Sequence, residues 1–395
     1  MRFLMACMQF PTAPGHSYMT TELAAALVAA GHQVDVVLLD WYAEPGGPTG
    51  FWTTADGTRI VRCTPRLIGG LPGPARAASK FLLSGRHVAR EAGRHLDLSH
   101  YDTLIAWMPA IAFAPLLART RHIRHRLLFI WDFFPDHHRE IGRIPGGLPF
   151  RLARAWEQSL LARFTAILCT LPGNAAYLRR AYHVRPDQRV LVTPIWSDTA
   201  ALSPVDRASV RSVHALPPDR PIAVFGGQLV EGRGFEQMLG AADAALATGS
   251  PLSFLFVGDG RLAPMLRARA GTQGNILYRP AMPRLDYLTL LGACDVGMVA
   301  TVPGVTSFSI PTKTIDYLRA RLPVIAAVEH GSDFVAILER YAIGRAVPFG
   351  AAEAFARAAA ELAADPAVHD GAARCLDEIF DVRHAVAAIM DAVRA

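Results

Sequence analysis

One lysine marks a segment of the chain that is suited to binding an anion. Only two of the 40 Lys and Arg residues are lysines, and one of them is Lys313 in TSFSIPTKTIDYL (306–318). Pro311 fits the first turn of a helix, where its missing amide hydrogen costs little. The free amides and the dipole of such a helix start attract negative charge. We therefore expect Lys313 to neutralise a bound anion, the alternative being a solvated helix residue.

A second set of candidates follows two short apolar segments. Gly226 and Gly227 close the segment 221–227, and Gly258 and Gly260 close the segment 252–260. Glycine has no Cβ, so backbone at these positions can approach a ligand closely. The alternative for the second pair is an ordinary turn between a strand and a helix.

Arg233 is the best candidate for holding phosphate oxygens. It lies five residues beyond Gln228, at the expected start of a helix. Its guanidinium can donate two parallel hydrogen bonds to a phosphate, whereas Gln228 can donate but adds no charge. A surface arginine near a helix start is the alternative.

Acidic and histidine side chains are concentrated in WDFFPDHHREIG (131–142), directly after an apolar segment. We expect these residues to lie near the end of a strand and to bind or orient a substrate, the alternative being loop packing. Their spacing matches no standard metal-ligand set, so no metal is expected. PGHS (14–17) occupies an equivalent position after the first apolar segment. The candidates of these two segments are Gly15, His16, Asp132, Asp136, His137 and His138.

A basic face is expected on a helix over residues 76–94. At about 100° per residue, Phe81, Val88, Ala92 and Leu96 lie on the opposite side. We interpret the basic face as a surface for an anionic membrane or a lipid diphosphate, the alternative being a plain solvated face. Its members are Arg76, Lys80, His87, Arg90 and Arg94.

Short apolar segments alternate with helical stretches along the whole chain. This alternation is typical of parallel sheets covered by helices. The apolar segments are residues 3–10, 34–39, 102–107, 126–132, 165–170, 189–194, 221–227, 252–260, 275–280, 295–300 and 323–328. In such sheets ligands bind beyond the carboxyl ends of the strands, so the candidates above fall where a ligand is expected.

The alternation is interrupted once, which predicts two domains. Residues 198–221 contain four prolines and no strong periodicity. We predict two Rossmann-like domains at 1–197 and 221–372, a linker at 198–220, and a C-terminal helix at 373–395 that packs back on the first domain. The two domains should face a central crevice.

Composition excludes several classes of protein. Hydrophobic residues make up 51% of the chain, which is incompatible with a disordered or fibrous protein. Five cysteines without metal-ligand spacing indicate reduced core residues of a cytoplasmic protein. Residues 1–215 carry 24 Lys and Arg against 15 Asp and Glu, a net charge of +9. No nucleic-acid-binding motif accompanies this charge, so nucleic acid is not an expected partner.

Five motifs in order resemble the nucleotide-sugar domain of glycosyltransferases with the two-domain GT-B fold, specifically the retaining family 4. The resemblance covers nearly the whole chain and is strongest over 222–349. A subset of bacterial polysaccharide transferases carries a Pro-Ser-Lys motif followed by Tyr, which Pro311-Thr312-Lys313 and Tyr317 resemble. The five motifs are GGQLVEGRGFEQML (226–239), FVGDGRL (256–262), CDVGMVA (294–300), IPTKTIDYLRARLPVIAA (310–327) and YAIGRAVPF (341–349).

The chain departs from the pattern of this family at three positions. Gln228 stands where the family usually has Arg, Phe308 where it has the first of two Glu residues, and Arg321 where it usually has Gly.

The resemblance implies a metal-independent transfer of a sugar from a nucleotide-sugar to a glycan or lipid-linked acceptor, with no cofactor. Asp316 would accept the ribose hydroxyls. The catalytic candidates are Arg233, Lys313, Asp132 and His16. The donor would contact Gly15, Gly226, Gly227, Gln228, Arg233, Gly258, Gly260, Ser309, Pro311, Thr312, Lys313 and Asp316. The acceptor would contact His16, Asp132, Asp136, His137 and His138.

Several alternatives remain open at this point. A histidine base in the first loop is typical of inverting transferases of the same fold, but their donor motifs are missing here, which favours retention. A nucleotide-sugar 2-epimerase would turn over the donor without an acceptor. A catalytically silent partner that binds the nucleotide-sugar would neither transfer the sugar nor turn over the donor. The expected place of action is bacterial surface polysaccharide or glycolipid synthesis, in the cytoplasm or on the inner face of the plasma membrane.

Overall fold

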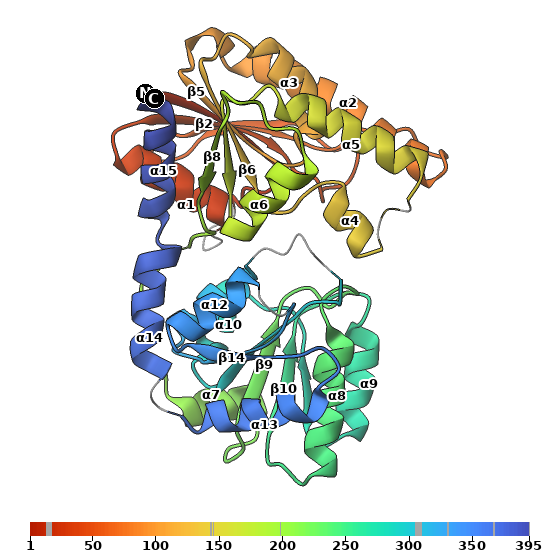
Figure 1. The fold of residues 1–395 in the computed structure, drawn as a ribbon, viewed down its shortest axis with the longest axis vertical. Coiled ribbons are helices and arrows are strands. Elements are labelled where there is room, and N and C mark those ends of the chain that lie inside the picture. Colours follow the sequence, from red (N-terminus) through yellow and green to blue (C-terminus); the bar gives the residue numbers. More distant parts are fainter. Residues whose placement is uncertain are drawn as a thin grey trace. The chain divides into compact units, whose positions relative to one another are not determined.

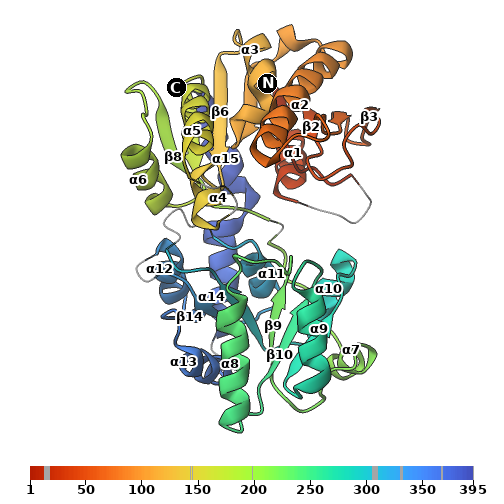
Figure 2. The ribbon, with the colours of Figure 1, turned by 90° about the vertical axis from the view of Figure 1, so that its right-hand side faces the viewer.

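Two α/β units make up the chain. The structure is a computed structural model, and it describes residues 1–12, 18–142, 144, 146–197, 199–304, 310–329, 332–365 and 368–394. Unit 1 comprises Met1–Ser197 with Val382–Ala395, and unit 2 comprises Asp198–Asp381 (Figures 1 and 2). Each unit has one largely parallel sheet with helices against it. The predicted fold class of two parallel-sheet α/β domains is therefore confirmed.

The sheet of unit 1 has the strand order β3-β4-β2-β1-β5-β6-β7-β8. All neighbours pair in parallel except β3 and β4, which are antiparallel. The central strands β1 and β5 are almost wholly buried, as expected for a parallel sheet covered on both faces. The strands are β1 (Arg2–Cys7), β2 (Gln33–Leu39), β3 (Gly50–Thr53), β4 (Arg59–Cys63), β5 (Thr103–Trp107), β6 (His125–Ile130), β7 (Ala166–Cys169) and β8 (Arg189–Val192).

The last helix of the chain belongs to unit 1. It packs against α1 and β6, and Arg189 of β8 donates hydrogen bonds to both the backbone and the carboxylate of Asp391. The helices of unit 1 are α1 (Met19–Ala29), α2 (Gly73–His95), α3 (Ala114–Arg119), α4 (Asp136–Glu140), α5 (Leu148–Leu161), α6 (Pro172–Ala181) and α15 (Val382–Arg394), with short 3₁₀ helices η1 (Leu98–His100) and η2 (Ala110–Phe113).

The sheet of unit 2 is parallel throughout, in the order β11-β10-β9-β12-β13-β14. The order runs outward from β9 in both directions, so the chain changes direction between β9 and β12. This reversal is the topological switch point of a doubly wound sheet. The strands are β9 (Ile222–Gly226), β10 (Ser253–Val257), β11 (Ile276–Arg279), β12 (Val296–Ala300), β13 (Val324–Ala327) and β14 (Gly344–Val347).

Residues 198–220, expected to form a linker, belong to unit 2 and contain a helix. Its Arg211 donates to Asp295 at 2.8 Å and to the backbone oxygen of Ala293 at 3.0 Å, which fixes the segment against the sheet. The helices of unit 2 are α7 (Arg207–Val213), α8 (Phe235–Ala247), α9 (Ala263–Thr272), α10 (Arg284–Leu291), α11 (Lys313–Arg319), α12 (Asp333–Arg340), α13 (Ala352–Ala363) and α14 (Val368–Cys375), followed by the π-helical turn η3 (Leu376–Phe380).

Candidate functional site

The candidate site of unit 2 lies at the carboxyl ends of β9 and β12. Helix α8 begins directly against this position. Gly234 precedes α8 with a φ of +64°, and a Cβ at this residue would lie 2.5 Å from the Cβ of Ala300 and 2.6 Å from the oxygen of Thr301. Only glycine fits there, because of both the backbone conformation and the close approach. The start of α8 is thereby fixed at the switch point.

The glycines at the ends of β9 and β10 are required by protein packing. A Cβ at Gly226 would lie 2.0 Å from Oη of Tyr287, and a Cβ at Gly258 would lie 1.9 Å from the oxygen of Gly227. The amide of Gly227 donates to Val257 at 3.0 Å, which ties the two loops together. Packing accounts for Gly226 and Gly258. At Gly227, whose φ is +135°, an added Cβ would meet no other atom, so the close approach of a ligand stays a prediction there.

Arg233 and Gln228 are both exposed on this side of unit 2. Arg233 immediately precedes Gly234, and its positive charge is close enough to lower the pKa of Lys313. The structure therefore brings Arg233 and Lys313 together, as the sequence predicts.

Lys313 is the first residue of α11, and its side chain is partly buried. Its Nζ lies 4.6 Å from the ring centroid of Phe225, the penultimate residue of β9. An ammonium over an aromatic face is stabilised electrostatically. Burial, reinforced by the charge of Arg233 and opposed by Asp316, lowers the pKa of Lys313 to about 7. At neutral pH this amine is thus poised between its neutral and charged forms.

Asp316 is held by an arginine that the sequence analysis did not identify. Arg284, the first residue of α10, donates to both carboxylate oxygens of Asp316, at 2.8 and 2.6 Å. Asp316 is only 8% exposed, so this bidentate pair satisfies a buried charge. The sequence gives no local signal for the pair, because the partners are 32 residues apart.

Tyr317 bridges the two central strands at the switch point. Its Oη lies 3.1 Å from the oxygen of Val224 in β9 and 3.2 Å from the oxygen of Met298 in β12. The amide of Gly226 donates to the same Oη at 3.4 Å. The ring fills the space over Gly297, where a Cβ would lie 2.2 Å from it. The tyrosine of the predicted motif is therefore a packing residue beneath the site.

Arg321 adopts the conformation in which glycine is favoured. Its φ is +57°, directly after α11, where the amide of Leu322 donates to the oxygen of Tyr317 at 2.8 Å. A left-handed residue after the last helical turn is usually glycine. The left-handed conformation accounts for the glycine that the family usually has at this position. This chain has an arginine there, whose backbone is strained.

Three predicted site residues lie outside the described residues: Gly15, His16 and Ser309. Phe308 is outside them as well. Pro311 and Thr312 precede α11, and the amide of Thr314 donates to the oxygen of Pro311 at 2.9 Å. The helix thus begins two residues later than expected.

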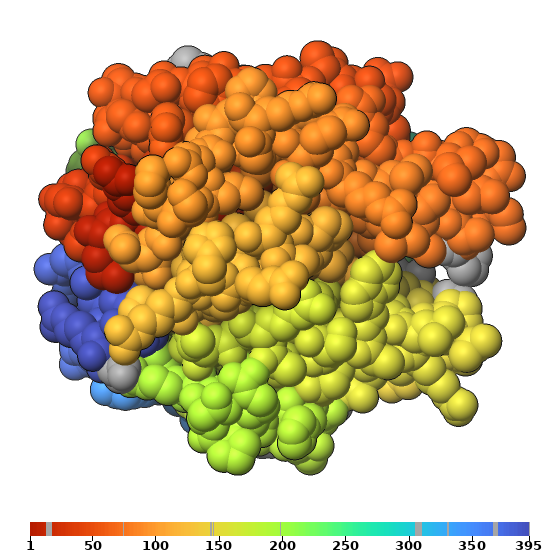
Figure 3. Space-filling view, turned by 90° about the horizontal axis from the view of Figure 1, so that it is seen from above, coloured from red at the N-terminus to blue at the C-terminus, as the bar shows by residue number. Residues whose placement is uncertain are grey.

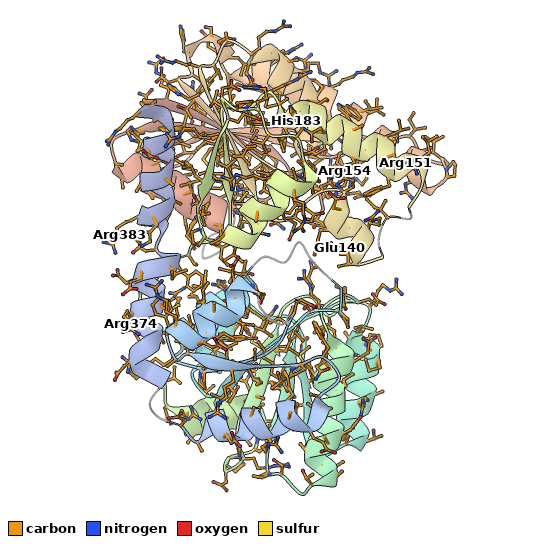
Figure 4. All side chains as sticks on the ribbon, in the orientation of Figure 1. Glu140, Arg151, Arg154, His183, Arg374 and Arg383 are labelled. Atoms are coloured by element: carbon orange, nitrogen blue, oxygen red, sulfur yellow. The ribbon has the colours of Figure 1, made fainter. Side chains whose placement is uncertain are left out.

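The acidic segment of unit 1 divides into an exposed and a buried part. Asp132 is exposed just after β6, whereas Asp136 is 4% exposed at the start of α4. Arg154 of α5, which is labelled in Figure 4, donates to both oxygens of Asp136 at 3.1 Å, and the hydroxyl of Tyr182 donates to the same carboxylate. Asp136 therefore has the alternative role of loop packing, because its ion pair with Arg154 joins α4 to α5.

His137 and His138 are partly buried on α4. The ring of His138 packs edge-to-face on Phe134, with centroids 5.3 Å apart, and Nδ1 of His137 lies 4.0 Å from Glu140. Both histidines contact their own segment, and Asp132 is the member of this set that is most open to a substrate.

A buried glutamate lies next to the carboxyl end of β5 in unit 1. Glu157 of α5 accepts hydrogen bonds from the amides of Ala110, at 2.5 Å, and Ile111, at 3.0 Å, at the start of η2. Burial, opposed by these two amides, raises the pKa of Glu157 to about 7. The sequence analysis did not identify this residue, because a lone Glu on a helix gives no sign of burial.

Two family matches agree with the division into units. Residues 15–196 match the family described as "Glycosyl transferase 4-like domain", and residues 220–365 match "Glycosyl transferases group 1". Together the matches cover more than half of the chain. The chain belongs to the glycosyltransferases.

Named relatives and solved structures agree with this family. The glycosyltransferase WbjE of Pseudomonas aeruginosa is 27% identical over 237 residues, which are 56% of this chain and 57% of the relative. A protein of Escherichia coli K12 named as the colanic acid biosynthesis glycosyl transferase WcaI is 26% identical over 234 residues, which are 55% of each chain. The chain therefore matches little more than half the length of these curated relatives.

The fold of this glycosyltransferase is shared with solved structures. An alpha,alpha-trehalose-phosphate synthase (UDP-forming) from Burkholderia xenovorans, solved with glucose-6-phosphate, superposes with a TM-score of 0.73 at 12% identity, covering 100% of both chains. This likeness confirms the GT-B fold.

The predicted basic face of α2 is only partly exposed in this glycosyltransferase. Arg76, Arg90 and Arg94 are exposed, but His87 is only 6% exposed, and Lys80 donates to the backbone oxygen of Trp41 at 2.9 Å. The expectation of a continuous basic face is corrected here, because the chain after β2 packs over part of the helix.

A carboxylate also reduces the positive charge of this face. Glu91 accepts from Arg90 at 3.0 Å and from Arg94 at 2.9 Å.

As for the bilayer itself, none of the helices in the described ranges combines the length and the apolar content needed to span it.

Proposed function

We propose that this chain transfers a sugar from a nucleotide-sugar donor to a glycan or lipid-linked acceptor, with retention of anomeric configuration. The observation that carries the proposal is the pairing of Lys313 and Arg233 at the carboxyl ends of β9 and β12, where doubly wound sheets bind nucleotides. Family membership and a UDP-forming structural neighbour support the nucleotide-sugar donor.

The two cations suit a departing diphosphate. When the bond between the sugar's anomeric carbon and the phosphate oxygen breaks, negative charge develops on that oxygen. The ammonium of Lys313 and the guanidinium of Arg233 would stabilise this charge without a metal or a cofactor. Burial and the charge of Arg233 lower the pKa of Lys313, and the negative diphosphate of a donor would favour its ammonium form.

For the acceptor we propose a front-face reaction. The acceptor oxygen forms its bond to the anomeric carbon on the face from which the diphosphate leaves, and its proton passes to the leaving phosphate oxygen. Retention follows from this geometry. Asp132, which is exposed after β6, is our candidate for orienting the acceptor.

We place the reaction in the synthesis of a bacterial surface polysaccharide or glycolipid. WcaI, named for colanic acid biosynthesis, supports this assignment. Unit 1 contains most of the +9 charge of residues 1–215, and its exposed Arg76 and Arg94 favour contact with an anionic acceptor or with an anionic membrane surface.

A thermal-shift screen of UDP-, GDP- and dTDP-sugars, followed by turnover of the stabilising donor, tests the proposal. We expect Lys313→Ala to lower turnover by roughly 100-fold or more, the usual loss for one charge-stabilising group. Exposed Arg267→Ala on α9 is the matched control. Donor turnover that needs no acceptor would favour an epimerase, and near-normal turnover by Lys313→Ala would remove this lysine from the mechanism.

A further inference from the structure

An arginine-lined pocket lies on unit 1, between α2 and the start of α3. Helices α2 and α3 lie side by side on this part of the unit, and their surface is visible in orange in Figure 3. The pocket between them has a volume of about 470 Å³, which falls in the usual range for small-molecule sites. Its lining residues are Arg66, Leu83, Arg86, His87, Ala89, Arg90, Pro115 and Arg119.

The lining is strongly positive. Four of the eight residues are arginines, and none of the eight carries a carboxylate. The nearby acid is Glu91, whose carboxylate is shared between Arg90 and Arg94. One carboxylate leaves a clear excess of positive charge around the pocket. Such an excess raises the local concentration of anions.

Most of the arginines are already held in position. Arg119 donates to the oxygen of Ala89 at 2.7 Å, and Arg66 donates to the oxygen of Gly47 at 3.3 Å. Each guanidinium has five N–H donors, so these bonds orient the group and leave other donors available. Arg86, by contrast, is exposed and has no acceptor within the described part of the chain.

His87 forms the buried floor of the pocket. One ring nitrogen lies 3.1 Å from the guanidinium of Arg90, and the other lies 3.1 Å from Oγ1 of Thr49. Because an arginine can only donate, Nδ1 accepts from Arg90, and Nε2 also lies 3.5 Å from the guanidinium of Arg66. Burial, with the charge of Arg66, lowers the pKa of His87, so the ring stays neutral and orients Arg90.

We propose that this pocket binds a small phosphate-bearing anion through Arg66, Arg86, Arg90 and Arg119. The planar forks of arginine match phosphate oxygens, and a phosphate monoester or diphosphate carries the two or more charges that such an excess can balance. All four arginines belong to unit 1, whereas Lys313 and Arg233 belong to unit 2, and the proposal does not depend on the proposed transfer reaction. The phosphate could belong to a soluble molecule or to a lipid headgroup.

Titration calorimetry with pyrophosphate tests this inference. Because the Lys313 site would also bind pyrophosphate, the measurement uses the Lys313→Ala chain as its background. Adding Arg86→Ala should weaken binding about tenfold, the effect of losing one charged hydrogen bond of at least 1.4 kcal/mol. Arg86→Lys should fall between the two. Arg179→Ala, an exposed arginine on α6, is the control with the same change of charge.

The outcomes separate the two sources of phosphate. Cosedimentation with phosphatidic acid vesicles that also depends on Arg86 would indicate a lipid headgroup, and pyrophosphate binding alone would indicate a soluble ligand. Equal pyrophosphate affinities for the Arg86→Ala and Arg179→Ala chains would overturn the proposal. So would the lack of any measurable pyrophosphate binding in the Lys313→Ala background.

Discussion

Arg284 and Asp316 form a two-point ion pair between the first turn of α10 and the middle of α11, with distances of 2.8 and 2.6 Å. Asp316 is the residue that we expected to bind ribose. Because both of its oxygens already accept from Arg284, its position is set before any ligand arrives. A carboxylate has about four lone-pair directions, so it can still accept from a sugar hydroxyl.

Breaking this pair should cost both stability and donor affinity. We expect Arg284→Ala to lower the free energy of unfolding by roughly 3 kcal/mol, because it leaves a buried carboxylate unpaired. Asp316→Asn should relieve part of that loss in the double variant. Denaturant unfolding of the four chains of this double-mutant cycle measures the coupling. Strictly additive effects would show that the pair contributes nothing.

Donor binding should be accompanied by proton uptake at Lys313. Its pKa of about 7 in the free protein should rise when a diphosphate is bound, because an anion favours the ammonium. At pH 8 a nucleotide-sugar should therefore bind with uptake of a proton, and its affinity should fall as the pH rises above 7. Calorimetry in buffers of different ionisation enthalpy measures this uptake.

The Lys313→Ala chain is the control for that measurement, and its proton uptake should be close to zero. Uptake that persists unchanged in this variant would assign the proton to another group.

Replacing the strained arginine after α11 should stabilise unit 2. Arg321→Gly removes the side chain from a φ of +57°, and we expect a gain of about 1 kcal/mol, close to the cost of the left-handed conformation. Arg321→Ala keeps a Cβ and should give no comparable gain. Thermal unfolding of the two variants compares them, and equal melting temperatures would contradict the strain at this position.

Glu157 should make the stability of unit 1 depend on pH. Its folded-state pKa of about 7 is above the model-peptide value near 4.3, so the unfolded chain binds fewer protons between these values. The contribution of Glu157 is therefore greatest below pH 4 and declines as the pH rises to 7. As the pH rises from 5 to 8, the melting temperature of the natural chain should therefore fall relative to that of Glu157→Gln.

A constant difference between these two chains across that range would show that Glu157 is ionised throughout. Exposed Glu236→Gln on α8 is a suitable control, since its environment gives no reason for such a trend.

The pattern of buried strands was predictable because it depends on local composition. The central strands are continuous apolar runs. Strands β5, β9, β10 and β12 fall within the segments that the sequence predicts, and β1 begins one residue before its segment. Strands β3, β4 and β14 were missed. In β3 exposed and half-buried residues alternate, and in β4 two arginines interrupt the apolar run, so neither resembles a buried strand.

The candidate site was predictable where a residue type or a motif was informative by itself. Lys313 and Arg233 were found in this way. Arg284 and Glu157 were not, because each acts through a partner that only the tertiary structure brings near. The helical pattern placed His87 on an open face of α2, and it could not show that Thr49, 38 residues earlier, covers the ring.

The assignment of α15 to unit 1 has a consequence for the order of synthesis. Unit 2 is complete in sequence at Asp381, whereas unit 1 needs α15 (Val382–Arg394). Arg189 cannot meet Asp391, and α1 cannot be covered by α15, until translation of this segment has ended. The sheet of unit 1 therefore cannot be completed by residues 1–197 alone, although they precede all of unit 2 in the sequence.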